Sequence, residues 1–163
     1  MMTNKAYDVV VIGAGVIGTS TAYHLVKKGL SVALVDRSDV ARGTSSHCDA
    51  MAMLTDKQPG ADAALGYASI LRFLELQKEL SYDFECHQEG SLYVCENDSQ
   101  LELATNYVKQ MQSEGYDVHI ADPYELHERE PFLARDLTGG IWSSVDCGLN
   151  PYKLCFAFVD QVL

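Results

Sequence analysis

The chain has 163 residues, a size that suits one ordinary domain. Its formal net charge is −11, which argues against partners with anionic surfaces, nucleic acids and acidic membranes among them. The sequence contains no apolar run of membrane-spanning length and no signal-peptide pattern at its start, and its five cysteines form no CxxC pair. We therefore expect a cytoplasmic protein with reduced thiols and no metal site.

The first structural element is a short apolar run rich in β-branched residues, Tyr7 to Ile12, which predicts a buried parallel strand. The pattern Gly13-Ala14-Gly15-Val16-Ile17-Gly18 follows at once. A helix is expected from about Val16 to Lys28, and a second strand runs from Ser31 to Val35 and ends at Asp36. This order of strand, glycine turn, helix, strand and acidic residue is the dinucleotide-binding βαβ unit.

Each residue of that pattern has a physical role. Gly13 permits the tight turn out of the strand, Gly15 lets the backbone approach a diphosphate, and Gly18 allows close packing of helix on strand. The N–H groups where the helix begins, around Val16 and Ile17, form an anion site. Asp36 is placed to accept hydrogen bonds from an adenosine ribose, and its charge would repel a 2′-phosphate. A glycine turn that binds nothing is the alternative.

Beyond Ser38 the chain is irregular up to about Gly60, and amphipathic or capped segments follow. The patterns predict helices from Ala63 to about Leu80 and from a capping box at Ser99–Glu102 to Gly115, with a short helix after Asp122-Pro123. Strands are expected at Gly90–Val94, Tyr116–Ile120 and Gly140–Ser143. A last helix, capped by Asn150-Pro151, is strongly apolar and needs a partner to pack against.

With these elements in view, the chain resembles the D-amino-acid oxidase-like family of FAD-dependent oxidoreductases. The resemblance is carried along the whole chain by the glycine pattern, Asp36, and a series of later motifs: Gly43-Thr44-Ser45-Ser46, Glu89-Gly90-Ser91-Leu92, Glu130-Pro131, Gly139-Gly140 and Asp146-Cys147-Gly148-Leu149-Asn150-Pro151. It implies an α/β fold, in which a Rossmann-like FAD-binding βαβ unit is followed by part of an α+β substrate domain. The expected division is 1–60 for the FAD domain, 61–145 for the substrate domain, and 146–163 for a helix returning to the FAD domain.

The resemblance implies FAD as cofactor and assigns roles to further residues. Arg37 and Arg42 look like the family's basic residues near the adenosine and the diphosphate, and Thr44, Ser45 and Ser46 match the turn along the phosphate and ribityl chain. Residues 47–53 would approach the isoalloxazine ring. His47 falls where some dimethylglycine-oxidising relatives carry a histidine joined covalently to flavin; a histidine that only lines the pocket is the other reading.

The implied reaction is oxidation of the C–N bond of an amino acid, an N-methyl amino acid or an opine by hydride transfer to flavin. We assign no catalytic residue, because the family's substrate-binding arginines and tyrosines mostly lie further along the chain than Leu163. The family's chains are at least twice this long, so we expect an N-terminal piece. Another FAD or NAD oxidoreductase with the same pattern, and a non-catalytic half or subunit, stay open, as do homo- and hetero-oligomers.

Overall fold

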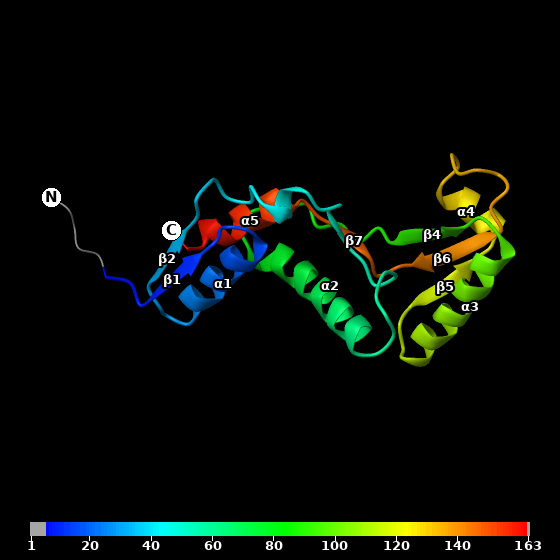
Figure 1. The fold of residues 1–163 in the computed structure, drawn as a ribbon, viewed down its shortest axis with the longest axis horizontal. Coiled ribbons are helices and arrows are strands. Elements are labelled where there is room, and N and C mark those ends of the chain that lie inside the picture. The colour runs from blue at the N-terminus through cyan, green and yellow to red at the C-terminus, as the bar shows by residue number, and fades with distance from the viewer. Residues whose placement is uncertain (1–5, 163) are drawn as a thin grey trace. The chain divides into compact units, whose positions relative to one another are not determined.

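The computed structural model describes residues 6–162, and its contacts divide them into two units (Figure 1). Unit 1 holds the described residues up to Ala50, together with Glu75–Cys86 and the residues from Leu149 onward. Unit 2 holds Met51–Leu74 and His87–Gly148. Residues 51–60, assigned from sequence to the N-terminal segment, group with unit 2, while 75–86 group with unit 1. How these units correspond to the domains of an enzyme stays a prediction.

Unit 1 contains the predicted βαβ motif. Strand β1 (Val9–Ile12) runs parallel to β2 (Val32–Val35), with Val9 opposite Val32 and Ile12 opposite Val35, and helix α1 (Val16–Lys27) connects them. A 3₁₀ turn, η1 (Thr44–Ser46), follows β2. The order of elements and the parallel pairing are therefore confirmed. The prediction that the first strand is buried is wrong for the described residues, because Val10 is 57% and Ile12 85% exposed.

The last helix, α5 (Pro151–Asp160), belongs to the same unit and packs against α1. The ring of Phe158 lies 5.2 Å from that of Tyr23, between centroids, and both side chains are buried. Leu154, Cys155 and Ala157 are buried on the same helix. The apolar face that the sequence left without a partner is thus covered in large part by α1.

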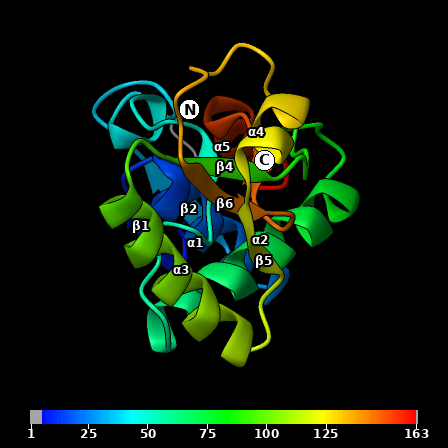
Figure 2. The same ribbon diagram turned by 90° about the vertical axis from the view of Figure 1, so that its right-hand side faces the viewer.

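Unit 2 is built on a three-stranded antiparallel sheet in the order β4-β6-β5, comprising Ser91–Cys95, Gly139–Ser143 and Val118–Ala121. Helix α3 (Asp98–Ser113) contacts all three strands, and Figure 2 shows it lying along them. The short helix α4 (Pro123–Arg129) contributes the fully buried Leu126 to a cluster with Ala121 and Leu137. The sheet, with helices α3 and α4 packed against it, forms a small α+β unit.

Two short strands were not predicted. Met51–Ala52 (β3) pairs in antiparallel fashion with Cys147–Gly148 (β7). Strand β3 lies in the stretch predicted to be irregular, and no element was predicted at β7. A two-residue strand shows no alternation of polar and apolar side chains, so periodicity cannot reveal it. The long helix α2 (Ala61–Glu79) begins two residues before the predicted start.

Helix caps show one correction. Helix α3 is capped by Asn97, whose side chain accepts from the N–H of Gln100 at 3.0 Å, so the predicted box at Ser99–Glu102 is wrong. The caps at Asp122 and Asn150 are confirmed, with Oδ1 of each accepting a backbone N–H three residues on. Asn97 precedes a run of polar residues, which hid the helix start.

None of the five cysteines, all of which lie within residues 6–162, forms a disulfide bond. Across residues 6–162, the helices are too short or too polar for any of them to cross a membrane.

Candidate functional site: a glycine-rich anion site in unit 1

The turn after β1 has the backbone that the glycine pattern requires. Gly13 has φ of +111°, in the left-handed region that side chains other than glycine rarely adopt. A Cβ on Gly18 would lie 1.7 Å from the carbonyl oxygen of Gly13, so the start of α1 touches the turn directly. The N–H of Gly13 donates to the carbonyl of Val35 at 2.8 Å and joins the turn to β2. The turn and helix are therefore locked together by close approach.

The N–H groups at this helix terminus fall into two sets. The N–H of Ala14 donates to Asp36 and that of Val16 donates to the Ser45 hydroxyl at 2.9 Å. The N–H groups of Gly15, Ile17 and Gly18 have no acceptor within residues 6–162. Free N–H groups at the positive end of a helix dipole are the donors that bind phosphate groups. The arrangement has the donor chemistry that an anion requires.

Asp36 stands at the end of β2 and supports the same turn. Its Oδ2 accepts from the N–H of Ala14 at 2.7 Å and its Oδ1 from the N–H of Ser38 at 2.9 Å. These backbone hydrogen bonds, the one from Ala14 first, hold the pKa of the carboxyl below its usual value. Sequence reasoning gave Asp36 a role toward ribose only. Its second role, bracing the glycine turn, came from the structure.

The η1 turn brings hydroxyl groups to the helix terminus. The Ser45 hydroxyl oxygen accepts a hydrogen bond from the N–H of Val16. The same oxygen lies 3.2 Å from the position that a Cβ on Gly15 would occupy, so the glycine leaves room for its approach. The Ser46 hydroxyl instead donates to the carbonyl of Gly43, within its own turn, at 2.9 Å. His47 is exposed, and its Nδ1 lies 2.9 Å from the same carbonyl oxygen.

An open hollow of about 550 Å³ adjoins the turn. Of the predicted site residues, it is lined by Gly13, Gly15, Val16, Ile17, Gly18, Thr44 and Ser45. Asp36 lines a neighbouring hollow, together with Val35 and Ser38. Arg37, Arg42, Ser46 and His47 line neither, and both arginines are exposed. The glycine turn and the η1 turn thus line one hollow together, whereas the two arginines contribute to neither hollow.

Two supporting residues had no signal in the sequence motif. Thr19, fully buried on α1, donates its hydroxyl hydrogen to the carbonyl of Gly15 at 3.0 Å. Cys155 of α5 is also fully buried, and burial raises the pKa of its thiol, while contacts with the Thr19 and Ser45 hydroxyls act the other way. A helix at the end of the chain therefore backs a turn near its beginning.

Comparison with known proteins identifies the family of this chain. Residues 8–163 match the model of the DAO family, described as FAD dependent oxidoreductase. The match spans nearly the whole chain, so the chain belongs to the DAO family of FAD-dependent oxidoreductases. FAD is the cofactor of this family, and the free N–H groups around Gly15 fit its diphosphate.

Particular relatives agree. The chain is 30% identical to glycine oxidase of Bacillus licheniformis over 161 residues, which cover 94% of this chain and 42% of that protein. It is 28% identical to the mitochondrial dimethylglycine dehydrogenase of Rattus norvegicus over 153 residues, 92% of this chain and 18% of that one. The chain thus spans less than half the length of these relatives.

Solved structures show the same fold. Glycine oxidase from Bacillus cereus superposes with a TM-score of 0.86 at 24% identity, over 96% of this chain and 44% of that one. L-amino acid deaminase from Proteus vulgaris also gives 0.86, at 23% identity, over 98% of this chain and 38% of that chain. The fold of this chain, a Rossmann-like unit and an α+β unit, is therefore shared with these two enzymes.

Proposed function

We propose that this chain is the N-terminal part of an FAD-dependent oxidoreductase that oxidises the C–N bond of an amino acid, an N-methyl amino acid or an opine. The observation that carries the proposal is the set of free N–H groups at Gly15, Ile17 and Gly18, framed by Ser45. Family membership and the likeness to glycine oxidase and dimethylglycine dehydrogenase support it. The flavin, when bound, supplies the acceptor for a hydride from the substrate carbon.

The residues of this chain bind and orient. The N–H groups of Gly15, Ile17 and Gly18 hold the diphosphate, and the Thr44, Ser45 and Ser46 turn follows the phosphate and ribityl chain. Asp36 keeps lone pairs for ribose hydroxyls in addition to the two N–H groups it already accepts. Arg37 and Arg42 neutralise charge near the adenosine and diphosphate. No residue described here is assigned as catalytic.

Of the residues assigned to the cofactor, His47 is the one that we place nearest the isoalloxazine ring. Its Nδ1 is held by the Gly43 carbonyl and the Ser46 hydroxyl, which fixes the imidazole and leaves Nε2 without a hydrogen bond to residues 6–162. We propose non-covalent contact. Flavin fluorescence that stays with the denatured polypeptide on a gel, and is lost in His47→Ala, would instead show covalent attachment.

A titration of the purified chain with FAD tests the binding site. We expect quenching of flavin fluorescence with a structured visible band, and its loss in Gly15→Val, whose branched side chain would collide with the Ser45 oxygen and block the diphosphate. Lys28→Ala, exposed at the far end of the same helix and outside the lining of the hollow, is the control. Unchanged flavin binding by Gly15→Val would mean that the diphosphate lies elsewhere.

Anaerobic reduction separates the alternatives. Bleaching of the bound flavin by a D-amino acid, sarcosine or an opine supports the proposed substrates. Bound flavin that none of these reduces favours another FAD or NAD oxidoreductase. A chain that binds no flavin yet forms a stable complex on gel filtration of the native extract favours a non-catalytic half or a subunit.

A further inference from the structure

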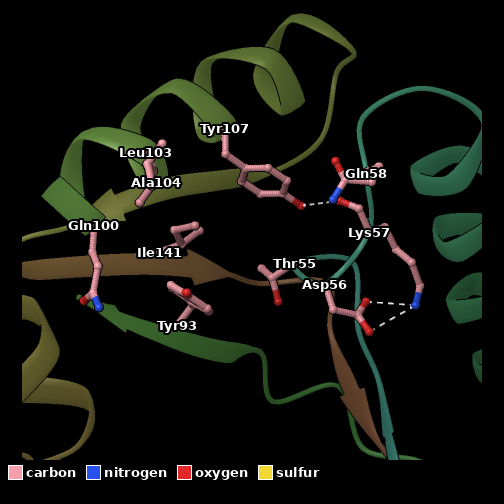
Figure 3. Close-up of a pocket in the computed structure, with 10 residues that line it drawn as sticks. All are labelled: Thr55, Asp56, Lys57, Gln58, Tyr93, Gln100, Leu103, Ala104, Tyr107 and Ile141. Carbon is pink, nitrogen blue, oxygen red and sulfur yellow. Dashed lines mark hydrogen bonds and ion pairs between the residues drawn. The ribbon is translucent and has the colours of Figure 1, made fainter. Parts of the chain in front are cut away.

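Unit 2 contains a hollow of about 240 Å³ that the flavin site does not use (Figure 3). It lies between α3, the strands β4 and β6, and the turn formed by residues 55–58. Its apolar walls come from Tyr93, Leu103, Tyr107 and Ile141. Tyr93 is 53% exposed and Leu103 71% exposed, although both face a concave surface. Large apolar side chains left half in water around a hollow favour a ligand with apolar groups.

The polar wall of this hollow is preformed. The Tyr107 hydroxyl lies 3.1 Å from the carbonyl oxygens of both Leu54 and Lys57, which fixes the turn to α3. The fully buried carboxylate of Asp146 accepts from the N–H of Leu54 at 2.8 Å and from the Thr55 hydroxyl at 3.0 Å. Little ordering is needed when a ligand binds to such a wall.

The surroundings of the hollow carry negative charge. The pKa of Tyr107 is raised to about 12, first by burial and then by four carboxylates, those of Asp146, Asp56, Asp62 and Glu114. Among the described residues that line the hollow, Lys57 is the one cation, and its ammonium pairs with Asp56 at 2.9 Å. Two further carboxylates stand directly behind the wall, since Asp146 accepts from the lining Thr55 hydroxyl and Asp62 from the N–H of the lining Gln58, so the hollow has a negative surplus that attracts cations.

We propose that this hollow binds a small organic ammonium ion, with its alkyl groups against Tyr93 and Leu103 and its charge toward the faces of the tyrosine rings and Asp56. Aromatic faces attract cations whose charge is spread over alkyl groups. The volume equals that of about eight water molecules, enough for a cation the size of choline. The site lies within unit 2, so it stands whether or not the protein is a flavoenzyme.

Choline and its uncharged analogue 3,3-dimethylbutan-1-ol are the probes. The two have the same shape, so calorimetric titration of the purified protein at low salt isolates the effect of charge. We expect saturable binding of choline, weakened by added salt, and at least about tenfold weaker binding of the alcohol. Equal binding of the two compounds, or no saturable binding of choline, would overturn the proposal.

Two variants and a control locate the site. Tyr93→Leu removes a half-exposed ring and should weaken choline binding about two- to fivefold. Lys57→Met keeps the stem that runs past Gly66 but removes the opposing charge, and it should tighten binding by a similar factor. Tyr124→Leu, 77% exposed on α4, should change nothing. Unaltered affinity in Lys57→Met would refute the placement even if Tyr93→Leu failed to fold.

Discussion

Gly18→Ala is the sharpest test of the glycine turn. The added Cβ would stand 1.7 Å from the carbonyl oxygen of Gly13 and 2.9 Å from its carbonyl carbon. An ordinary C···O contact is about 3.3 Å or longer, so helix and turn must separate by about 1.5 Å. Such overpacking costs about 1–3 kcal/mol or more, while alanine returns about 1 kcal/mol of helix propensity. We expect a net loss of about 2 kcal/mol in the free energy of unfolding.

The separation also displaces the free N–H groups of Gly15 and Ile17, so flavin affinity should fall at least about tenfold. Urea unfolding followed by circular dichroism measures the first effect, and fluorescence titration with FAD measures the second. Lys28→Ala adds an alanine at the exposed end of the same helix, outside the lining of the hollow, and should stay within about 0.5 kcal/mol of the wild type. The close-approach argument fails if Gly18→Ala matches this control in both assays.

The remaining predictions concern two carboxylates. Asp36 has a lowered pKa, so its hydrogen bonds to Ala14 and Ser38 stabilise the fold above the usual value of 3.8 and are lost as the pH falls through the lower folded value. Asp36→Asn should therefore unfold more easily than the wild type at neutral pH, and the gap should close in acid; a gap independent of pH would contradict this. Asp146→Ala removes the acceptor of the Leu54 N–H and of the Thr55 and Ser91 hydroxyls, at a cost of about 3 kcal/mol in urea unfolding, because Leu54 keeps a buried unpaired N–H. Asp56→Ala, whose ion pair with Lys57 is partly exposed, should cost less than about 1 kcal/mol, and equal losses would refute the special role of Asp146.

The sequence by itself determined the βαβ unit and its ligand class. Val9 to Asp36 encode their structure locally: β-branched strands, a glycine turn that needs φ above zero, and a helix of regular period. Caps at Asp122 and Asn150 are equally local, since a side chain three residues away satisfies the helix N–H. Family resemblance then named the cofactor, and the match over residues 8–163 confirms that family.

Tertiary structure decided what joins distant residues. Ser45 reaches the N–H of Val16 from 29 positions away, Asp36 reaches Ala14 from 22, and Asp146 reaches Leu54 from 92. The short strands β3 and β7 likewise form only because they pair with each other. Such contacts leave no period or spacing in the sequence, because chain folding alone brings the partners together. The motif therefore predicts where an anion would bind, and only the fold showed which residues hold that turn in place.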